Sequence, residues 1–588
     1  MIIVPRIMAA AVLLAAVVSA QTNFYPLRDL KPGMHAIGRT VFSGDRIEEF
    51  NVEILGVLEN IGPKQSLILG RLSGGPLAKT GVMQGMSGSP VFIGGRLVGA
   101  VAMAFPFATE AIAGIRPIDD MLRISPAVAE PSRRAAVSLT DTDLTRLFPR
   151  QTQVFAGDAK MIDIATPVSF GGFTQAAIEQ FAPQLRAAGL EPRQGVTAGG
   201  RVDPHMGDPS RIKPGSMISV QLMTGDMSIG ADGTVTWIDG NKIYAFGHRF
   251  LSVGATAMPF ARAEVMTLLP ALSSSFKVST AKELMGTILQ DRSTAVSGEL
   301  GARAALVPVS VSVSHAGRKP DAYKMQMVDD GLLSPLLVQM AVFSAIDATE
   351  RTVGASSFRL RGEIEFHGAA APVRLDNMFA GDNGSAMQAS LSAAVPLAYV
   401  LQSGFDALKL KKIDVAIESY DAKKQLQIDR VLASKRVARP GDEIDLAVVL
   451  AGDNGAETTR SVHYRVPEGA TPGTLYFTVA DGNTTNIAEI RQFLNNVPKS
   501  PAQLLSVVNS LRANTKAYIR VWRADPAFQI EGGDFPDPPP SVALILAGSQ
   551  TVLGGVSQIR NSKLAELEIG GGDTMISGSK TIQVEIKE

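Results

Sequence analysis

Residues 84–101, QGMSGSPVFIGGRLVGAV, join a glycine-rich bend to a pair of short apolar runs. Gly94-Gly95 separates the two runs and is a two-residue hairpin signal, so we expect a β-hairpin here. Ser87 lies between two glycines at the bend, where a serine Oγ can be exposed. Gly85 accepts backbone conformations closed to other residues, which lets the amides of Gly85 and Ser87 point to one spot. An oxyanion would develop at such a spot during acyl transfer. An ordinary Gly/Ser turn before a hairpin is the competing interpretation.

The segment around this bend, from Phe24 to about Leu122, consists of further short runs of strand character. Residues 50–58 alternate partly between apolar and polar positions, and residues 66–69 form a short apolar run. Strands at this spacing favour a small β-barrel or a sandwich.

Strand-like segments return after residue 210. Residues 234–238 and 242–246 flank Asp239-Gly240-Asn241, which is a second hairpin signal. Residues 140–150 and 174–190 have helical periodicity instead, so we expect a helical connection between two β-rich units.

The rest of the chain mixes both patterns. Residues 333–348 are helix-like, residues 358–366 are strand-like, and a further β-rich unit begins near Leu410. Short strands with turn signals up to about Ala480 favour an immunoglobulin-like sandwich. The expected divisions are a signal peptide at 1–20, a serine-bearing β unit at 21–130, a helical connection at 131–210, a histidine-bearing β unit at 211–320, a mixed α/β region at 321–407, the sandwich at 408–480 and a mixed C-terminal region at 481–588.

Residues 1–20 have the pattern of a Sec-type signal peptide. Arg6 precedes an apolar run at residues 7–18, and residues 18–20 place small side chains where signal peptidase needs them. The run is about a dozen residues, short of the ~20 that span a bilayer, so cleavage is favoured over an uncleaved anchor. No later segment reaches ~18 uninterrupted apolar residues. We therefore expect a secreted or periplasmic chain with no stable transmembrane segment.

Composition excludes several classes of function. Lysine plus arginine and aspartate plus glutamate each number 56, so no basic excess exists to neutralise phosphates, and nucleic-acid binding is not expected. Cysteine is absent, which removes thiolate catalysis, disulfides, iron–sulfur clusters and cysteine-ligated zinc. The chain has no Gly-rich loop ending in Gly-Lys-Ser/Thr and no His-Glu-x-x-His, so we expect no cofactor and no metal. Hydroxyl chemistry remains the main route to covalent catalysis.

A nucleophilic serine needs a base, and one of the six histidines stands out. His248 follows Gly247 at the end of the strand-like run 242–246, where it is rigidly placed and open to a cleft. A purely structural role for His248 is the competing interpretation. The others have solvated, loop or strand settings without catalytic neighbours: His35, His205, His315, His367 and His463.

With these residues in view, the chain resembles the stage IV sporulation protein B (SpoIVB-type) family of serine peptidases. The resemblance covers about residues 24–125 and 215–305. Residues 84–90 and 95–101 are similar to the family's serine segment. The segments similar to the sequence that precedes this serine are residues 30–33, 50–54 and 79–81. Residues 233–236 and 244–248 are similar to the family's histidine segment.

The resemblance implies a mainly β chain with a chymotrypsin-like double β-barrel. It also implies Ser87 as nucleophile, His248 as general base, and the amides of Gly85 and Ser87 as the oxyanion hole. In the family the histidine barrel comes first, whereas here the serine half is N-terminal, as if the domain were circularly permuted. One catalytic geometry occurs on unrelated folds in different chain orders, so order alone does not reject the pair. The family's PDZ module is not evident, and the immunoglobulin-like region is a candidate substitute for substrate capture.

The acid of the catalytic group is less well defined. The family's aspartate lies shortly upstream of its serine, but residues 73–76 contain no carboxylate. Asp291 is the first candidate to replace it, with a surface ion pair as the competing interpretation. Asp239 and Asp232 are weaker candidates, because hairpin turns explain them. A Ser–His dyad without an orienting acid would act more slowly; loss of the acid's function in a Ser-His-Asp peptidase lowers kcat by about 10⁴-fold.

Two functions remain open from the sequence. The first is an extracytoplasmic serine endopeptidase that hydrolyses peptide bonds through Ser87 and His248. The alternative is a catalytically silent peptidase-like module for binding or assembly in the bacterial cell envelope, motivated by the missing aspartate and the large β-rich C-terminal half. The expected partners are a protein or peptide substrate and an envelope protein bound by the C-terminal β-rich region.

Overall fold

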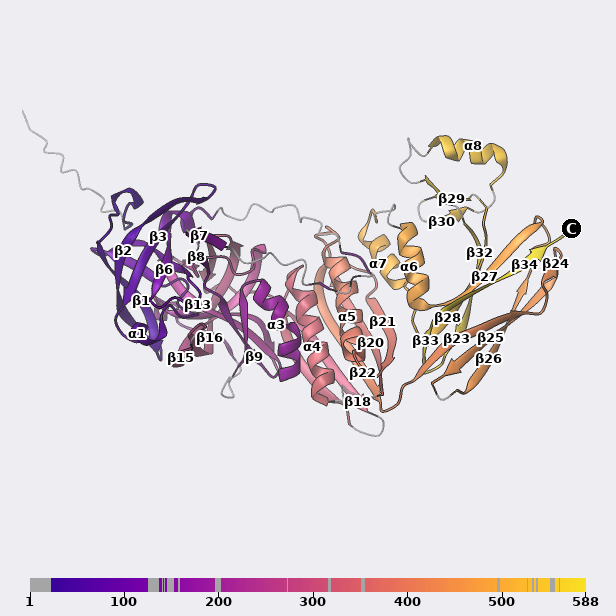
Figure 1. Ribbon diagram of the computed structural model, residues 1–588, viewed down its shortest axis with the longest axis horizontal. Coiled ribbons are helices and arrows are strands. Elements are labelled where there is room, and N and C mark those ends of the chain that lie inside the picture. Colours follow the sequence, from indigo (N-terminus) through magenta and orange to yellow (C-terminus); the bar gives the residue numbers. More distant parts are fainter. Residues whose placement is uncertain are drawn as a thin grey trace, which may run out of the picture.

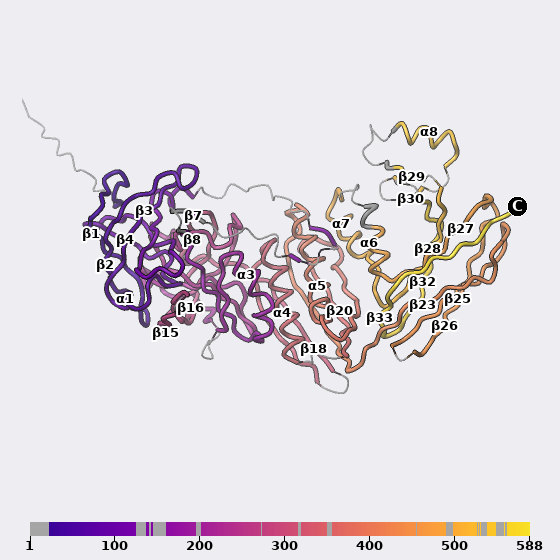
Figure 2. The backbone as a smooth tube through the Cα atoms, viewed as in Figure 1, coloured from indigo at the N-terminus to yellow at the C-terminus, as the bar shows by residue number. Residues whose placement is uncertain are grey.

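The molecule is elongated, with two β-barrels at one end, a long sheet covered by helices in the middle and a β-sandwich at the other end (Figures 1 and 2). The signal-peptide prediction lies outside the residues that the structure describes, as does most of the predicted helix 140–150. The computed structural model describes residues 23–124, 137–139, 141, 143–144, 153–156, 159–195, 202–271, 273–315, 319–349, 355–453, 455–493, 498–525, 527–530, 533–535, 538–549, 556–559 and 561–588.

Six antiparallel strands close the first barrel: β1 (His35–Ser43), β2 (Arg46–Gly62), β3 (Gln65–Ser73), β4 (Pro90–Ile93), β5 (Arg96–Ala104) and β6 (Ile112–Pro117). They pair in the order β1-β2-β3-β6-β5-β4, and β4 pairs with β1 to complete the ring. Alternate residues of β1 are buried, because successive side chains of a strand point to opposite faces. The hairpin predicted at Gly94-Gly95 is confirmed by the pairing of β4 with β5.

The second barrel repeats this topology with β12 (Met217–Gly225), β13 (Ser228–Asp239), β14 (Lys242–Ala245), β15 (Gly254–Leu269), β16 (Phe276–Arg292) and β17 (Ala295–Leu300). Its order is β12-β13-β14-β17-β16-β15, closed by the pairing of β12 with β15. The hairpin predicted at Asp239-Gly240-Asn241 joins β13 to β14, as expected. Two closed barrels of one strand order confirm the predicted mainly β, chymotrypsin-like fold.

The connection between the barrels is only partly helical, which corrects the prediction for residues 131–210. It contains α3 (Gln175–Ala187), which begins at its N-cap Thr174, but also β7 (Gln153–Ala156), β8 (Ala159–Asp163), β9 (Thr166–Gly171) and β10 (Leu190–Gln194). β8 pairs with β5 of the first barrel, and β9 pairs with β13 of the second. All four strands have six residues or fewer, and β8 and β9 also pair with barrel strands far away in the sequence, so the local pattern did not reveal them.

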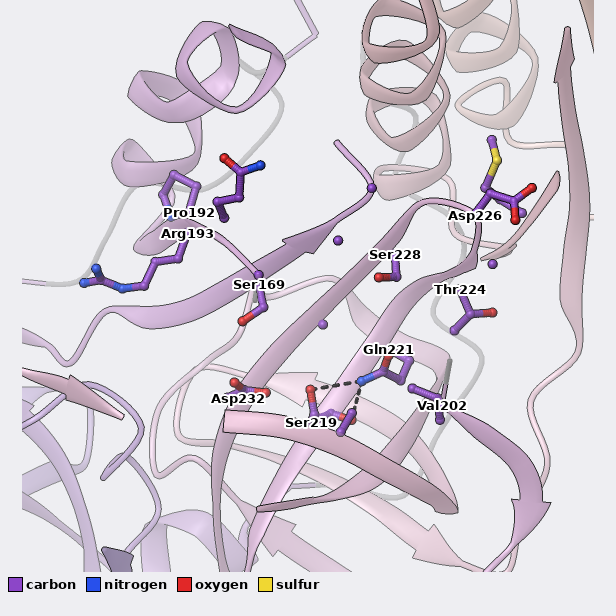
Figure 3. Close-up of a pocket in the computed structure, with 18 of the residues that line it drawn as sticks. Ser169, Pro192, Arg193, Val202, Ser219, Gln221, Thr224, Asp226, Ser228 and Asp232 are labelled. Atoms are coloured by element: carbon purple, nitrogen blue, oxygen red, sulfur yellow. Dashed lines mark hydrogen bonds between the residues drawn. The ribbon is translucent and has the colours of Figure 1, made fainter. Parts of the chain in front are cut away.

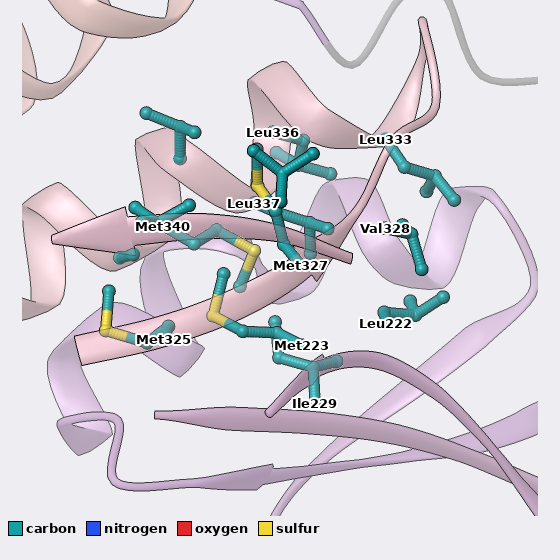
Figure 4. Close-up of a cluster of buried hydrophobic side chains, with 14 of the residues drawn as sticks. Leu222, Met223, Ile229, Met325, Met327, Val328, Leu333, Leu336, Leu337 and Met340 are labelled. Atoms are coloured by element: carbon teal, nitrogen blue, oxygen red, sulfur yellow. The ribbon is translucent and has the colours of Figure 1, made fainter. Parts of the chain in front are cut away.

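A 14-stranded sheet runs through the second barrel into the middle of the molecule. It adds β18 (Leu306–His315), β19 (Asp321–Val328), β20 (Ser356–His367), β21 (Val373–Gly381) and β22 (Lys409–Tyr420). The helices α3, α4 (Leu333–Thr349) and α5 (Ser385–Leu401) cover its apolar face, where α4 packs Leu336 and Leu337 onto methionine-rich strands (Figure 4). The predicted helix at 333–348 and strand at 358–366 are confirmed. β22 pairs with β18, so the sandwich does not begin near Leu410 as predicted.

The C-terminal sandwich has two sheets. One contains β23 (Gln425–Ala433), β25 (Glu443–Gly452), β26 (Glu457–Arg465) and β33 (Met575–Ser577), and the other contains β24 (Val437–Ala438), β27 (Gly473–Asp481), β28 (Lys516–Arg523), β32 (Ser562–Gly570) and β34 (Ser579–Ile586). Both sheets share one apolar core. The sandwich therefore extends past its predicted end at Ala480, because β34 returns to pair with β27.

The remaining elements are small additions to these units. Within the residues described, no helix has both the length and the apolar character needed to cross a membrane. The additions are α1 (Leu77–Thr80), α2 (Ile118–Leu122), β11 (Asp203–Met206), α6 (Gly482–Phe493), α7 (Pro501–Asn509), β29 (Ala527–Ile530), β30 (Gly533–Phe535), α8 (Pro540–Ser549) and β31 (Val556–Ile559).

Candidate active site

Ser87 lies in the loop between β3 and β4, the third and fourth strands of the first barrel. Gly85 and Gly88 have φ angles of +88° and +92°, a region that strains residues with a side chain. The amides of Gly85 and Ser87 donate to no residue within the described part of the chain. The Ser87 side chain is fully buried, and its Oγ has no hydrogen-bond partner among the described residues.

His248 lies in the loop between β14 and β15, which is the same place in the second barrel. Its Nδ1 is 2.6 Å from the carbonyl oxygen of Arg249. Because a carbonyl can only accept, Nδ1 carries the proton and Nε2 keeps a lone pair. That Nε2 is buried, and no described residue bonds to it. Burial lowers the pKa of His248, although the nearby Asp163 carboxylate opposes this, so the imidazole is neutral at pH 7.

The two loops meet where the barrels pack together. The backbone amide of Thr234, on β13, donates to the Ser87 carbonyl at 2.9 Å, and its hydroxyl donates to the Gly85 carbonyl at 2.9 Å. A methyl group on Gly88 would lie 2.6 Å from the amide nitrogen of Phe246, two residues before His248. The structure thus brings the serine and histidine segments into contact, while Ser87 Oγ and His248 Nε2 are not hydrogen-bonded to each other.

Asp291 is buried on β16 rather than paired with an arginine at the surface. Its carboxylate accepts from the backbone amides of Phe250 at 2.8 Å, Leu251 at 2.7 Å and Val253 at 3.2 Å. Burial raises its pKa to about 6 against these hydrogen bonds, which lower it. Asp291 therefore holds the loop that follows His248, and its oxygens are directed at backbone groups.

A different carboxylate, that of Asp163, acts on the imidazole. The amide of Ile164 donates to the Ala102 carbonyl at 2.9 Å, and a methyl on Gly247 would lie 3.3 Å from the Ala102 Cβ. The end of β8 therefore runs close to the residue before His248. The sequence analysis missed Asp163, because it lies on a strand in a segment expected to be helical.

Arg116 is a further buried charged residue at the contact between the two barrels. Its Nε donates to the Gly247 carbonyl at 3.4 Å, so β6 of the first barrel holds the histidine loop of the second. Burial lowers the pKa of Arg116, and the neighbouring Asp163 and Asp120 carboxylates oppose that effect.

The two weaker acid candidates lie apart from His248. Asp239 is exposed as the last residue of β13, at the hairpin turn to β14. Asp232 lies within β13, not in a turn as predicted, and it is buried with a hydrogen bond from the Ser279 hydroxyl. Burial raises the pKa of Asp232 to about 6.

A buried lysine lies behind the serine loop. Lys277 Nζ donates to Thr40 Oγ1 at 2.7 Å, and Ser89 Oγ donates to the same oxygen at 3.0 Å. Burial lowers the pKa of Lys277 to about 7, although Asp232 opposes this. A methyl on Gly85 would lie 3.2 Å from the Lys277 Cδ, so the lysine stem supports the loop that presents the two amides.

Beside this site is a cleft of about 1260 Å³ (Figure 3). It is lined by the polar face of β13 and β12, by β9 and β10, and by the start of β16. Neither Ser87 nor His248 lines it, but Lys277 and Phe276 do, and both are next to the serine loop.

Two barrels of one topology, with a serine and a histidine on matching loops at their contact, are consistent with a chymotrypsin-like fold. Residues 18–122 match the family model described as SpoIVB peptidase S55. This segment contains the first barrel and Ser87, so the resemblance seen in the sequence is confirmed there: the N-terminal barrel is similar to serine peptidases of the SpoIVB kind. No curated protein and no solved structure matches the chain.

Proposed function

We propose that this protein is an extracytoplasmic serine endopeptidase in which Ser87 is the nucleophile and His248 the general base. The observation that carries the proposal is the placement of both residues on the loop between the third and fourth strands of their barrels. Two barrels that pack face to face through the same loop bring these residues to one interface. The serine and the histidine meet at this interface whichever barrel carries the serine. The serine-first order of this chain therefore requires no circular permutation of the fold.

The atoms at the interface that have no partner among the described residues match the steps of acyl transfer. His248 Nε2 accepts the proton of Ser87 Oγ as the oxygen attacks the peptide carbonyl. The amides of Gly85 and Ser87 then donate to the oxyanion. The imidazolium returns its proton to the leaving amine, and water hydrolyses the acyl-enzyme with His248 again as the base.

The buried carboxylates have separate roles in this proposal. Asp163 stabilises the imidazolium that forms on His248, because it is the nearby charge of opposite sign. Asp291 fixes the loop after His248 through its three backbone hydrogen bonds. Asp291 is thus a positioning residue.

Access to the pair requires the loops to move. Ser87 is 0% exposed and His248 is 2% exposed, so a peptide carbonyl cannot reach Oγ in this conformation. Catalytic hydrogen bonds are commonly long in unliganded enzymes and tighten when substrate binds. We expect the serine loop to open on substrate binding and the Ser87–His248 hydrogen bond to form then.

Labelling with a fluorophosphonate tests the nucleophile directly. The purified protein should be labelled at Ser87, and Ser87→Ala should lose the label. Ser89→Ala is the matched control, because Ser89 lies two residues away in the same loop with its hydroxyl bonded to Thr40. Labelling that survives Ser87→Ala, or that is absent from the wild type under several conditions, would reject the proposal.

The silent-module alternative is favoured by one observation, namely the burial of both reactive groups. It predicts that Ser87→Ala and His248→Ala variants complement a deletion of the gene as well as the wild type. Failure of both to complement, with normal protein levels, rejects the alternative.

The extracytoplasmic setting rests on the pattern of residues 1–20. Sequencing the N-terminus of the protein from the producing cell tests it, and a mature chain that begins at Gln21 is expected. A chain that retains residues 1–20 in the cytoplasmic fraction would contradict this setting.

A further inference from the structure

The floor of the cleft is a polar face built across six neighbouring strands: β9, β13, β12, β19, β18 and β22. On β12, Ser219 and Gln221 face the cleft, while Val220 between them packs in the apolar core. The same alternation places Ser310 and Gln326 on the floor. We call this surface the polar trough.

The trough is a built surface with an ordered hydrogen-bond network. Ser219 and Gln221 are each 3% exposed, and the Gln221 side-chain amide donates to Ser219 Oγ at 2.9 Å. Asp232, also on the floor, accepts from the Ser279 hydroxyl. Figure 3 shows Ser219, Gln221 and Asp232 near one another, below Ser169 and Arg193 in this view. Its volume of about 1260 Å³ exceeds the ~300–1,000 Å³ of typical small-molecule pockets, which favours a larger ligand.

The charges of the trough favour a ligand that is close to neutral. Cations and anions are interleaved, and two pairs neutralise each other: Arg186 with Glu191 at 3.1 Å, and Lys412 with Asp414 at 2.6 Å. No field of one sign exists to select a polyanion. Hydroxyl and amide side chains instead offer the donors and acceptors that peptide groups require.

The aromatic content argues against a glycan. Sugar rings are bound through their apolar faces on open aromatic rings. Phe276 is the single aromatic residue among the described residues that line the trough, and the guanidinium of Arg193 lies over its ring at 3.3 Å from the ring centre. That ring is thus already covered.

The trough is continuous with the serine loop. Arg193 Nη2 donates to Gln84 Oε1 at 3.0 Å, and the Lys277 amide donates to the Gln84 carbonyl at 3.2 Å. Gln84 is three residues before Ser87. A ligand held against Arg193 and Lys277 is therefore adjacent to the loop that must open for catalysis.

We propose that the polar trough binds an extended, unfolded stretch of the polypeptide substrate and delivers it to the serine loop. This rests on the proposed peptidase function. It gives the chain a means of substrate capture within the second barrel and its sheet, in place of a separate module.

Binding to the Ser87→Ala protein tests this without cleavage. Fluorescein-labelled carboxymethylated lactalbumin, a permanently unfolded polypeptide, should bind and raise the fluorescence anisotropy. Ser228, at the start of β13, lines the trough as Ser310 does. Ser310→Trp and, independently, Ser228→Trp fill the trough and should weaken binding by about tenfold or more, as loss of ~1.4 kcal/mol of contact would. Ser312→Trp is the matched control on the same face of β18, outside the trough, and should bind normally.

Three results would overturn the proposal: no binding of the unfolded polypeptide, equal binding by the trough and control variants, or preferential binding of a labelled chito-oligosaccharide. Circular dichroism melting of each variant separates a filled trough from a misfolded protein. Fluorophosphonate labelling of the Ser310→Trp chain with Ser87 intact separates the two proposals. If Ser310→Trp is labelled normally but no longer binds the polypeptide, both the peptidase function and the trough proposal are supported. If the wild type is not labelled but still binds the polypeptide, only the peptidase function is rejected.

Discussion

The imidazole of His248 is acted on by charges from three separate parts of the chain: Asp163, Arg116 and Arg249. Among these three charges only Asp163 favours the protonated ring, so Asp163→Asn should lower the pKa of His248 further. We expect the acid limb of the pH–rate profile for fluorophosphonate labelling to move to lower pH. The plateau rate should also fall, by less than the ~10⁴-fold seen when an acid that holds the imidazole directly is lost.

Asp291→Asn separates this effect from loop positioning. It weakens the hydrogen bonds to Phe250 and Leu251, so it should slow labelling while leaving the pH of the acid limb unchanged. An acid limb that stays in place in Asp163→Asn would show that Asp163 does not act on the imidazole. An acid limb that moves only in Asp291→Asn would favour Asp291, the acid expected from the sequence.

Lys277 makes the stability of the second barrel depend on pH. In the folded chain its pKa is about 7, whereas its ordinary value is 10.5, so unfolding takes up a proton between these values. Stability should therefore rise with pH above 7, by at most about 1.4 kcal/mol per pH unit, and the rise ends near the unfolded pKa. Lys277→Met should remove this dependence in urea unfolding at pH 7, 8 and 9.

The chain offers a clean probe and control for this measurement. The chain contains two tryptophans, Trp237 and Trp522. In a Trp522→Phe background, the fluorescence of Trp237, on β13, follows the unfolding of the second barrel. Lys79→Met, which removes an exposed lysine of α1, should keep the pH dependence. A Lys277→Met protein whose stability still rises from pH 7 to 9 would show that another group titrates.

At the scale of the element, Gly88 determines how closely the serine loop approaches β13. A methyl there would lie 2.0 Å from the Thr234 carbonyl oxygen, and φ is +92°. Gly88→Ala should therefore push the loop away, destabilise the barrel by roughly 3 kcal/mol or more, and abolish fluorophosphonate labelling. Unfolding followed through Trp237, together with labelling, measures both effects.

Gly94→Ala is the matched control for backbone strain alone. Gly94 also has a positive φ, of +56°, but a methyl there meets nothing within 4 Å. It should cost only about 1 kcal/mol and preserve labelling. If the two variants behave alike, close packing of the two barrels is not what fixes the loop.

How much of each element the sequence revealed depended on whether its signal was local. The hairpin at Gly94-Gly95 and the helix near Leu333 were predictable, because turn chemistry and periodicity lie within a few residues. Strand β8 was not, since its pairing with β5 joins segments far apart in the chain. Ser87 and His248 could be singled out by motif, whereas the contact between their loops and the effect of the Asp163 charge follow only from barrel packing.

On the scale of the whole molecule, the barrels and the sandwich have separate apolar cores. Polar contacts link the sandwich to the central sheet, chiefly the Asn514 side chain with the backbone of Met378 and Arg359 with Asp573. Residues of α7 also pack on the central sheet, at the end away from the barrels (Figure 1). The sequence could not place the boundary between these units, because β34 completes the sandwich from the far end of the chain.

This separation predicts that the proposed peptidase activity does not depend on the sandwich. A chain that ends at Lys424 loses the sandwich and α7 but keeps both barrels, the polar trough and the 14-stranded sheet. It should be labelled by a fluorophosphonate at the rate of the full chain and should unfold identically by Trp237 fluorescence. The apolar patch uncovered on α5 and β21 lies far from Ser87, so it should lower solubility without changing that rate. A rate reduced tenfold or more, in a protein with a normal Trp237 transition, would show that the C-terminal region controls the opening of the serine loop. That result would move the sandwich from a separate module into the catalytic cycle.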